Sequence, residues 1–225
     1  MKHIGMLVAR EIDAVLNEFG QPQEERAFGD FTVRTYQMPG YTLSVMHSGI
    51  GEIAAAAATQ LLISVYGVDM IINFGVVGGL TPEMGQTRTC VVERVVHTDY
   101  DGSAIDGTAV GQYIEYPDVY IPTTPELVDK ATALNPALKR VTCASADKFI
   151  SGEAAKTALH EQFGADICEM EAAGVVLTCR RNRVPCLLIK TVSDSITGGA
   201  EEYYEALEET SRVCLRIADA IIREL

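Results

Sequence analysis

The distribution of apolar and polar positions along the chain predicts strands that alternate with helices. Short runs rich in β-branched and apolar residues are typical of buried strands, and apolar residues that recur every three or four positions are typical of amphipathic helices. The runs predict strands over residues 2–9, 31–37, 41–46, 68–74, 89–97, 140–144 and 184–189. The periodic segments predict helices over residues 11–19, 52–66, 125–134, 154–163, 175–183 and 201–225.

Strands that alternate with helices indicate an α/β fold, here a three-layer αβα sandwich. The two strands on either side of Pro39-Gly40 form a predicted hairpin, which makes the central sheet mixed. The chain has 225 residues and no internal repeat or linker. We therefore expect a single domain over residues 1–225.

Several loops that follow predicted strands have the composition of a ligand pocket. Residues 48–51, Ser-Gly-Ile-Gly, precede a helix, as in sites where the backbone approaches a ligand. Residues 75–79, Gly-Val-Val-Gly-Gly, predict a flexible turn at a strand end, and residues 145–150 contribute a carboxylate and an aromatic ring. Such loops favour a polar, planar ligand.

Two acidic segments lie at either end of one predicted helix–strand unit. Glu171 is expected to open the helix, and Asp194 follows the strand at the edge of the sheet where ligands bind in α/β folds. A carboxyl group in that position is a candidate acid or base, because partial desolvation raises its pKa toward neutrality. The alternative is that Asp194 only caps the turn Ser-Asp-Ser.

Composition and charge exclude several classes of function. The formal net charge of −13 disfavours binding to DNA, RNA or an anionic membrane, so a small molecule is the expected partner. The apolar part of residues 1–10 is too short for a signal peptide, and no apolar run approaches the length of a membrane span. The six cysteines contain no C-x-x-C pair, which predicts reduced thiols in a cytoplasmic protein and no zinc site. Neither H-E-x-x-H nor G-x-S-x-G occurs, and no metal or cofactor is expected.

The chain resembles a known family from its first strand to its last helix. The landmarks are Ile4-Gly5, Ser48-Gly49-Ile50-Gly51, Asn73 with Gly75 and Gly78-Gly79-Leu80, Asp147 with Phe149-Ile150, Glu169-Met170-Glu171-Ala172, and Ser193-Asp194. They are similar to those of the nucleoside phosphorylase/nucleosidase superfamily, above all the 5′-methylthioadenosine/S-adenosylhomocysteine nucleosidases. The resemblance implies a nucleoside phosphorylase-like fold, hydrolysis of a purine nucleoside without a cofactor, and a place in methionine salvage.

The resemblance also implies roles for individual residues. Asp194 would protonate nitrogen-7 of the leaving purine, and Glu171 would hold the ribose hydroxyls with Met170 packed under the sugar. Phe149 would stack on the base, and the backbone of Ile150 would bind its edge.

Further positions complete the expected site. Asp13 stands where the family has a water-activating glutamate, with Glu11 as the alternative if the helix is shifted. Ser193, Ile50 and Val76 would also contact the substrate. The family further implies a homodimer in which residues 98–120 complete the 5′ pocket of the neighbouring subunit.

Three departures from the family pattern leave alternatives open. Lys190 replaces an arginine near the water, Val76 replaces a serine, and Arg10 replaces an apolar residue of the 5′ pocket. A phosphorylase that uses phosphate in place of water, or a non-catalytic nucleoside-binding protein, would carry the same fold. Residues 72–77, which are apolar apart from Asn73, and the carboxylate of Asp13 favour water as the nucleophile.

Overall fold

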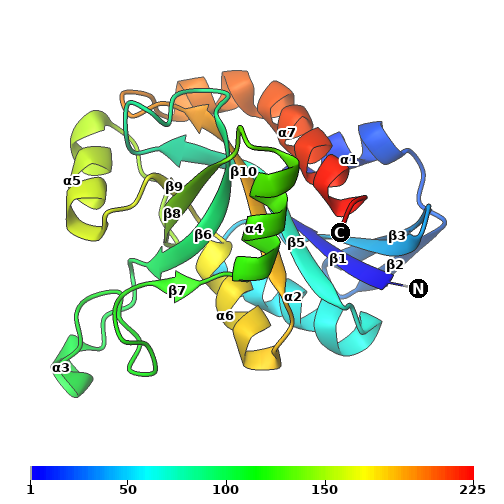
Figure 1. Ribbon diagram of the computed structural model, residues 1–225, viewed down its shortest axis with the longest axis horizontal. Coiled ribbons are helices and arrows are strands. Elements are labelled where there is room, and N and C mark those ends of the chain that lie inside the picture. The colour runs from blue at the N-terminus through cyan, green and yellow to red at the C-terminus, as the bar shows by residue number, and fades with distance from the viewer. Residues whose placement is uncertain (1) are drawn as a thin grey trace.

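The computed structural model describes residues 2–225, and it has a central sheet with helices on both faces (Figure 1). The strands are β1 (Lys2–Val8), β2 (Glu24–Phe28), β3 (Phe31–Met38), β4 (Tyr41–His47), β5 (Met70–Gly79), β6 (Thr89–His97), β7 (Ile121–Pro122), β8 (Lys139–Ser145), β9 (Ile167–Glu169) and β10 (Cys186–Asp194). The helices are α1 (Ile12–Phe19), α2 (Glu52–Tyr66), α3 (Ser103–Asp106), α4 (Pro125–Leu134), α5 (Glu153–Phe163), α6 (Ala172–Asn182) and α7 (Ala200–Ile222). The predicted α/β class with a mixed central sheet is confirmed.

The sheet contains a closed circuit of strands. β1 lies between β4 and β5 and runs parallel to both. β5 also pairs with β10 in parallel and with β9 in antiparallel orientation. From β9 the pairing continues through β8 and β6 to β10, so that β5, β9, β8, β6 and β10 close on themselves. Beyond β4, the antiparallel strands β3 and β2 extend the sheet.

Apolar helix faces cover the sheet from both sides. α2 and α6 pack against each other on one face, and α7 packs on β10 and β5 with α1 beside it on the other. α2 buries small side chains such as Ala55 and Ala58, which lets α6 approach closely. At the closest point residue 174 must be glycine, because a Cβ on Gly174 would overlap the carbonyl oxygen of Glu52.

The prediction of a flexible turn at residues 75–79 was wrong, because these residues form the second half of β5. Gly75, Gly78 and Gly79 are not among the glycines with positive φ. A Cβ on Gly79 would overlap the carbonyl oxygen of Met84, so close packing requires glycine here. β10 is likewise longer than predicted, and Asp194 is its last residue.

None of the helices within residues 2–225 is both long and apolar enough to cross a lipid bilayer.

Candidate active site

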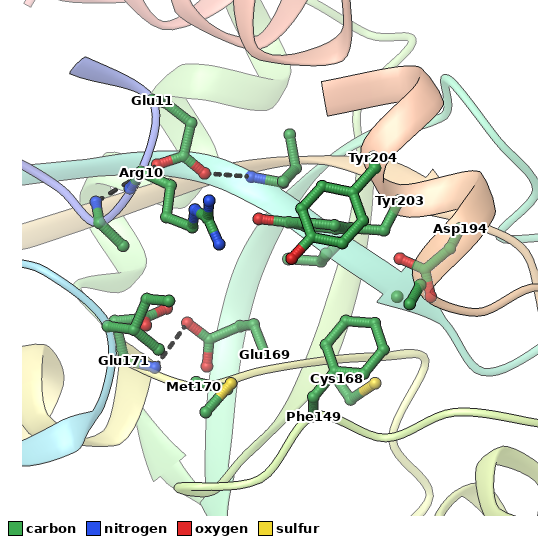
Figure 2. A pocket seen from close by; sticks show the side chains of 16 residues that line it. Arg10, Glu11, Phe149, Cys168, Glu169, Met170, Glu171, Asp194, Tyr203 and Tyr204 are labelled. Carbon is green, nitrogen blue, oxygen red and sulfur yellow. Dashed lines mark hydrogen bonds between the residues drawn. The ribbon is translucent and has the colours of Figure 1, made fainter. Parts of the chain in front are cut away.

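A cavity of about 340 Å³ lies at the carboxyl ends of β1, β5 and β10 (Figure 2). These three strands are parallel neighbours, so the residues at their ends come together at one edge of the sheet. The segment between β9 and α6 and the start of α7 close the cavity. Its lining consists of Ala9, Arg10, Glu11, Ile50, Val76, Val77, Gly78, Phe149, Cys168, Glu169, Met170, Glu171, Asp194, Ala200, Tyr203 and Tyr204.

Asp194 ends β10 at one side of the cavity, and its carboxylate is only 1% exposed. Its Oδ2 accepts a hydrogen bond from Nζ of Lys156 at 2.6 Å, and its Oδ1 accepts one from Oγ of Ser193 at 2.8 Å. Both oxygens therefore have a fixed partner. This geometry differs from that of an exposed turn cap, since such a cap would bind backbone amides.

Glu11, and not Asp13, brings the carboxylate at the end of β1 into the cavity. Glu11 is buried, and its two oxygens accept hydrogen bonds from the backbone amides of Ala9, Arg10 and Val76 at 3.2, 2.9 and 3.0 Å. Asp13 lies in the first turn of α1, is exposed, and lines a separate groove between α1 and α7. The structure thus places the sequence-predicted Asp13 outside the cavity and the alternative, Glu11, within it.

Glu171 lies across the cavity from Asp194, in the segment that leads into α6 (Figure 2). The backbone amide of Gly51 donates a hydrogen bond of 2.9 Å to its Oε1, which ties this carboxyl group to the start of α2. Burial, and then the negative charge of Glu169, raise the pKa of Glu171 to about 8, although the nearby Lys190 opposes the shift.

A buried polar cluster supports Glu171 from behind. Nζ of Lys190 on β10 lies 3.3 Å from Oε2 of Glu169. Burial disfavours the ammonium of Lys190, but Glu169 and Glu171 outweigh this effect and raise the pKa of Lys190 above its ordinary value. Ser145 Oγ joins Glu169 to Glu52, the first residue of α2, and burial together with Glu169 raises the pKa of Glu52 to about 7.

Aromatic side chains and one cation form the outer part of the cavity. Phe149 packs edge-to-face on Tyr203, with ring centroids 5.7 Å apart. The guanidinium of Arg10 lies 5.8 Å from the ring centroid of Tyr204 and points into the cavity (Figure 2). Within residues 2–225 Arg10 forms no ion pair, so its positive charge is available to a ligand.

The remaining residues that the sequence singled out fall into two groups. Met170, Ile50 and Val76 line the cavity together with Phe149. Ser193 lies behind Asp194 as its hydrogen-bond donor, and Ile150 packs on the apolar cluster below α5 instead of lining the cavity.

Sequence reasoning missed several residues of the site. Tyr203 and Tyr204 sit in the first turns of a long helix, where tyrosines carry no functional signal of their own. Lys156 lies in a short amphipathic helix, and a lysine there is ordinarily a surface residue. Within residues 2–225 no three His, Cys, Asp or Glu side chains gather as the ligands of a metal ion would.

Comparisons with known proteins agree with one another. The model of the family described as "Phosphorylase superfamily" matches residues 4–225. An aminodeoxyfutalosine nucleosidase of Helicobacter pylori (strain J99) is 27% identical over 239 residues, which cover 100% of both chains. A 5′-methylthioadenosine/S-adenosylhomocysteine nucleosidase of Shewanella sediminis is 33% identical over 164 residues, which cover 71% of each chain.

Solved structures show the same fold over the whole chain. The 5′-methylthioadenosine/S-adenosylhomocysteine nucleosidase of Helicobacter pylori, in complex with a substituted pyrrolidin-3-ol, matches with a TM-score of 0.93 and 28% identity, covering 100% of this chain and 99% of the other. The futalosine hydrolase of Helicobacter pylori strain 26695 matches with a TM-score of 0.93 and 27% identity, covering 100% and 98%. The chain belongs to the phosphorylase superfamily, and within it to the enzymes that hydrolyse N-glycosidic bonds.

Proposed function

We propose that this protein hydrolyses the N-glycosidic bond of a purine nucleoside with a modified 5′ position. 5′-Methylthioadenosine, S-adenosylhomocysteine and aminodeoxyfutalosine, which appear in the names of its relatives, are the candidate substrates. One observation carries the proposal: Asp194 lies at one end of the cavity, and Glu11 and Glu171 lie at the other (Figure 2).

The reaction needs carboxyl groups on both sides of the scissile bond. As the bond between the sugar and the base breaks, positive charge develops on the sugar and negative charge on the base. We assign Asp194 to the base side, where it gives a proton to nitrogen-7 so that the purine leaves as a neutral molecule. Ser193 holds the carboxyl group of Asp194 in place.

We assign activation of the water to Glu11 in place of Asp13. Three backbone amides fix the Glu11 carboxylate, and Gly75 leaves room for it, because a Cβ at residue 75 would lie 2.9 Å from Oε1 of Glu11. A rigid carboxylate at the sugar end of the cavity can take a proton from water as the water attacks the sugar carbon. The exposed side chain of Asp13 has no such position.

The other cavity residues supply binding. Glu171 accepts hydrogen bonds from the ribose hydroxyls, and Met170 packs under the sugar. Phe149 stacks on the purine, and the loop that carries Ile150 reaches the edge of the base through its backbone. The 5′ group faces the outer part of the cavity, near Arg10 and Ile50.

The cavity favours water over phosphate as the nucleophile. A phosphate dianion needs several free donors, yet the amide of Val76 is bound to Glu11 and the ammonium of Lys190 is paired with Glu169. The cation that remains is Arg10, which lies at the outer side of the cavity. The phosphorylase alternative therefore rests on Arg10, and the non-catalytic alternative must explain the opposed carboxylates.

A nucleoside panel separates these alternatives. The protein is incubated with 5′-methylthioadenosine, S-adenosylhomocysteine, adenosine and inosine, with and without phosphate, and the products are separated by chromatography. We expect free purine and free sugar in phosphate-free buffer, with little change on adding phosphate. A sugar 1-phosphate as the product would establish the phosphorylase, and tight binding without cleavage would establish the non-catalytic protein.

We also propose that the protein is a cytoplasmic homodimer. The support is the exposure of the apolar side chains of Ile53, Ile105 and Ile114, which are 82%, 89% and 68% exposed and which an interface would bury. Ile105 and Ile114 lie in residues 98–120, a segment that contains α3 and projects from the body (Figure 1). The rings of Tyr100 and Tyr113 stack within this segment, with centroids 3.9 Å apart. Light scattering of the active protein tests this, and an active monomer would contradict it. The cytoplasmic assignment is supported by the six free cysteines.

A further inference from the structure

Lys156 is a fully buried cation that faces the back of the candidate active site. It lies on α5, and its side chain is 0% exposed. Its Nζ donates hydrogen bonds of 2.6 Å to Oδ2 of Asp194 and 2.6 Å to the carbonyl oxygen of Ser195. Lys156 does not line the cavity, so any effect on a substrate acts through Asp194.

Few other ionisable groups surround this pair. From β9, the thiol of Cys168 faces both partners, and burial raises its pKa to about 12, so it remains a neutral thiol. From α7, the carboxylate of Glu202 binds the amide and the hydroxyl of Ser195, and so fixes the carbonyl that Lys156 contacts. The Lys156–Asp194 pair therefore exchanges protons between its own two members or with a ligand.

The contact with Lys156 conflicts with the proposed role of Asp194 as the acid. An ammonium at 2.6 Å favours the ionised form of a carboxyl group, whereas protonation of a purine requires Asp194 to give a proton away. The conflict disappears when the pair is treated as one unit that holds one exchangeable proton. Carboxylate with ammonium, and carboxylic acid with neutral amine, are then two arrangements of the same unit.

We propose that Lys156 is a positioning residue that supplies Asp194 with the proton delivered to the leaving purine, an inference that rests on the proposed nucleosidase reaction. As the bond between sugar and base breaks, its electron pair moves into the purine. An N–H bond of Lys156 breaks as its proton passes to the carboxylate of Asp194, and the O–H bond so formed breaks as nitrogen-7 takes that proton, so that Asp194 ends as a carboxylate. Lys156 is left as a neutral amine and regains its proton from solvent after the base has left.

The proposal has a consequence for the pH range of the enzyme. An ordinary aspartic acid loses its proton near pH 4 and an ordinary lysine near pH 10.4. A unit that contains the lysine therefore keeps its exchangeable proton well into the alkaline range, where an isolated carboxyl group would be deprotonated. Turnover should remain high at alkaline pH because of Lys156.

The test compares pH profiles of kcat/KM for four proteins with 5′-methylthioadenosine. Lys156→Met keeps the length of the side chain but has no proton to give. Lys156→Arg keeps the charge, but arginine holds its proton at every assay pH. Lys130→Met, on the exposed surface of α4, is the control. Circular dichroism and thermal melting of each variant establish that it is folded.

We expect the alkaline limit of activity to move toward acid by several pH units in both Lys156 variants, because an ordinary aspartic acid loses its proton about six pH units below an ordinary lysine. A wild-type profile in Lys156→Arg would overturn the proposal, because charge alone would then suffice. A uniform loss at every pH in the folded variants would also overturn it and leave a purely structural role. Should Lys156→Met fail to fold, Lys156→Arg alone decides. Asp194→Asn tests the proposed function separately: turnover retained in that variant would remove Asp194 as the acid, whatever Lys156 does.

Discussion

The backbone amide of Val76 donates a hydrogen bond of 3.0 Å to Oε1 of Glu11, and this contact joins the end of β1 to β5 inside the cavity. It fixes the carboxylate of Glu11, the residue directly before α1, at the lining of the cavity. The neighbouring Asp13, two residues on, turns away from the cavity.

Because Glu11 lines the cavity and Asp13 does not, we expect the matched variants Glu11→Gln and Asp13→Asn to differ in kcat. Glu11→Gln keeps the shape of the side chain but cannot accept a proton from water, so kcat should fall about 10²–10⁴-fold. Asp13→Asn, the matched control, should keep kcat within about twofold, as is usual when a surface residue does not touch substrate. Steady-state assays with 5′-methylthioadenosine measure kcat for both variants. A larger loss of kcat in Asp13→Asn than in Glu11→Gln would identify Asp13 as the base.

Glu171 predicts a dependence on the ribose hydroxyls and on pH. Its carboxylate form, the proposed acceptor of hydrogen bonds from both hydroxyls, is gained as pH rises through its pKa of about 8. KM for a ribonucleoside should therefore fall as pH rises from about 6.5 to about 8.5. For the 2′-deoxynucleoside this trend should be weaker, and in Glu171→Gln it should vanish together with the preference for the ribonucleoside. The same pH dependence in that variant would assign the titration to another group.

From the position of Arg10 we expect the protein to prefer substrates with a negatively charged 5′ group. Its guanidinium points into the cavity and has no carboxylate partner within residues 2–225, so an anionic 5′-carboxyalkylthio group should bind better than the corresponding neutral amide. Arg10→Met should raise KM for the anionic substrate about fivefold, as expected for an exposed pair worth about 1 kcal/mol, and leave the amide unchanged. Arg212→Met, which removes a cation of the neighbouring groove, is the control. Equal effects of Arg10→Met on both substrates would exclude a charge-specific role.

The buried Glu52 predicts that stability depends on pH. Its pKa is raised from an ordinary 4.5 to about 7 in the folded protein, so between these values the folded state binds more protons than the unfolded state. The free energy of unfolding should therefore fall as pH rises from about 4.5 to about 7, and Glu171 extends the same trend to about 8. Urea denaturation across this range measures the slope. Glu52→Gln should flatten it, and Glu153→Gln, an exposed residue of α5, should not.

Much of the fold follows from local patterns, and the exceptions have physical reasons. The strand of residues 89–97 and the helices of residues 52–66 and 125–134 coincide with β6, α2 and α4, because their local composition is typical of these elements, such as the run of alanines in α2. β9 has three residues, too few for any period to be visible. The closed circuit depends on pairings between strands far apart in the sequence, such as β10 with β6. The pattern of hydrophobic residues along the chain does not predict which strands pair.

Some residues of the candidate site could likewise be predicted from the sequence, and others could not. Sequence motifs singled out Asp194 and Glu171, whose blocks are specific and correctly spaced, and both residues line the cavity. The choice between Asp13 and Glu11 depends on where α1 begins, and a shift of one or two residues reverses which side chain faces the cavity. Lys156 could not be found, because only the three-dimensional structure shows that its face of α5 is turned toward Asp194.

The closed circuit of strands has a consequence for solubility. A strand at the border of a sheet offers unpaired backbone groups to other chains, and this is a common route to aggregation. Closure gives both sides of β5, β9, β8, β6 and β10 a partner, so within residues 2–225 the long border strand is β2 at the far end of the sheet. β2 begins Glu-Glu-Arg and is almost wholly exposed. These charged side chains disfavour pairing of β2 with a strand of another copy of the chain.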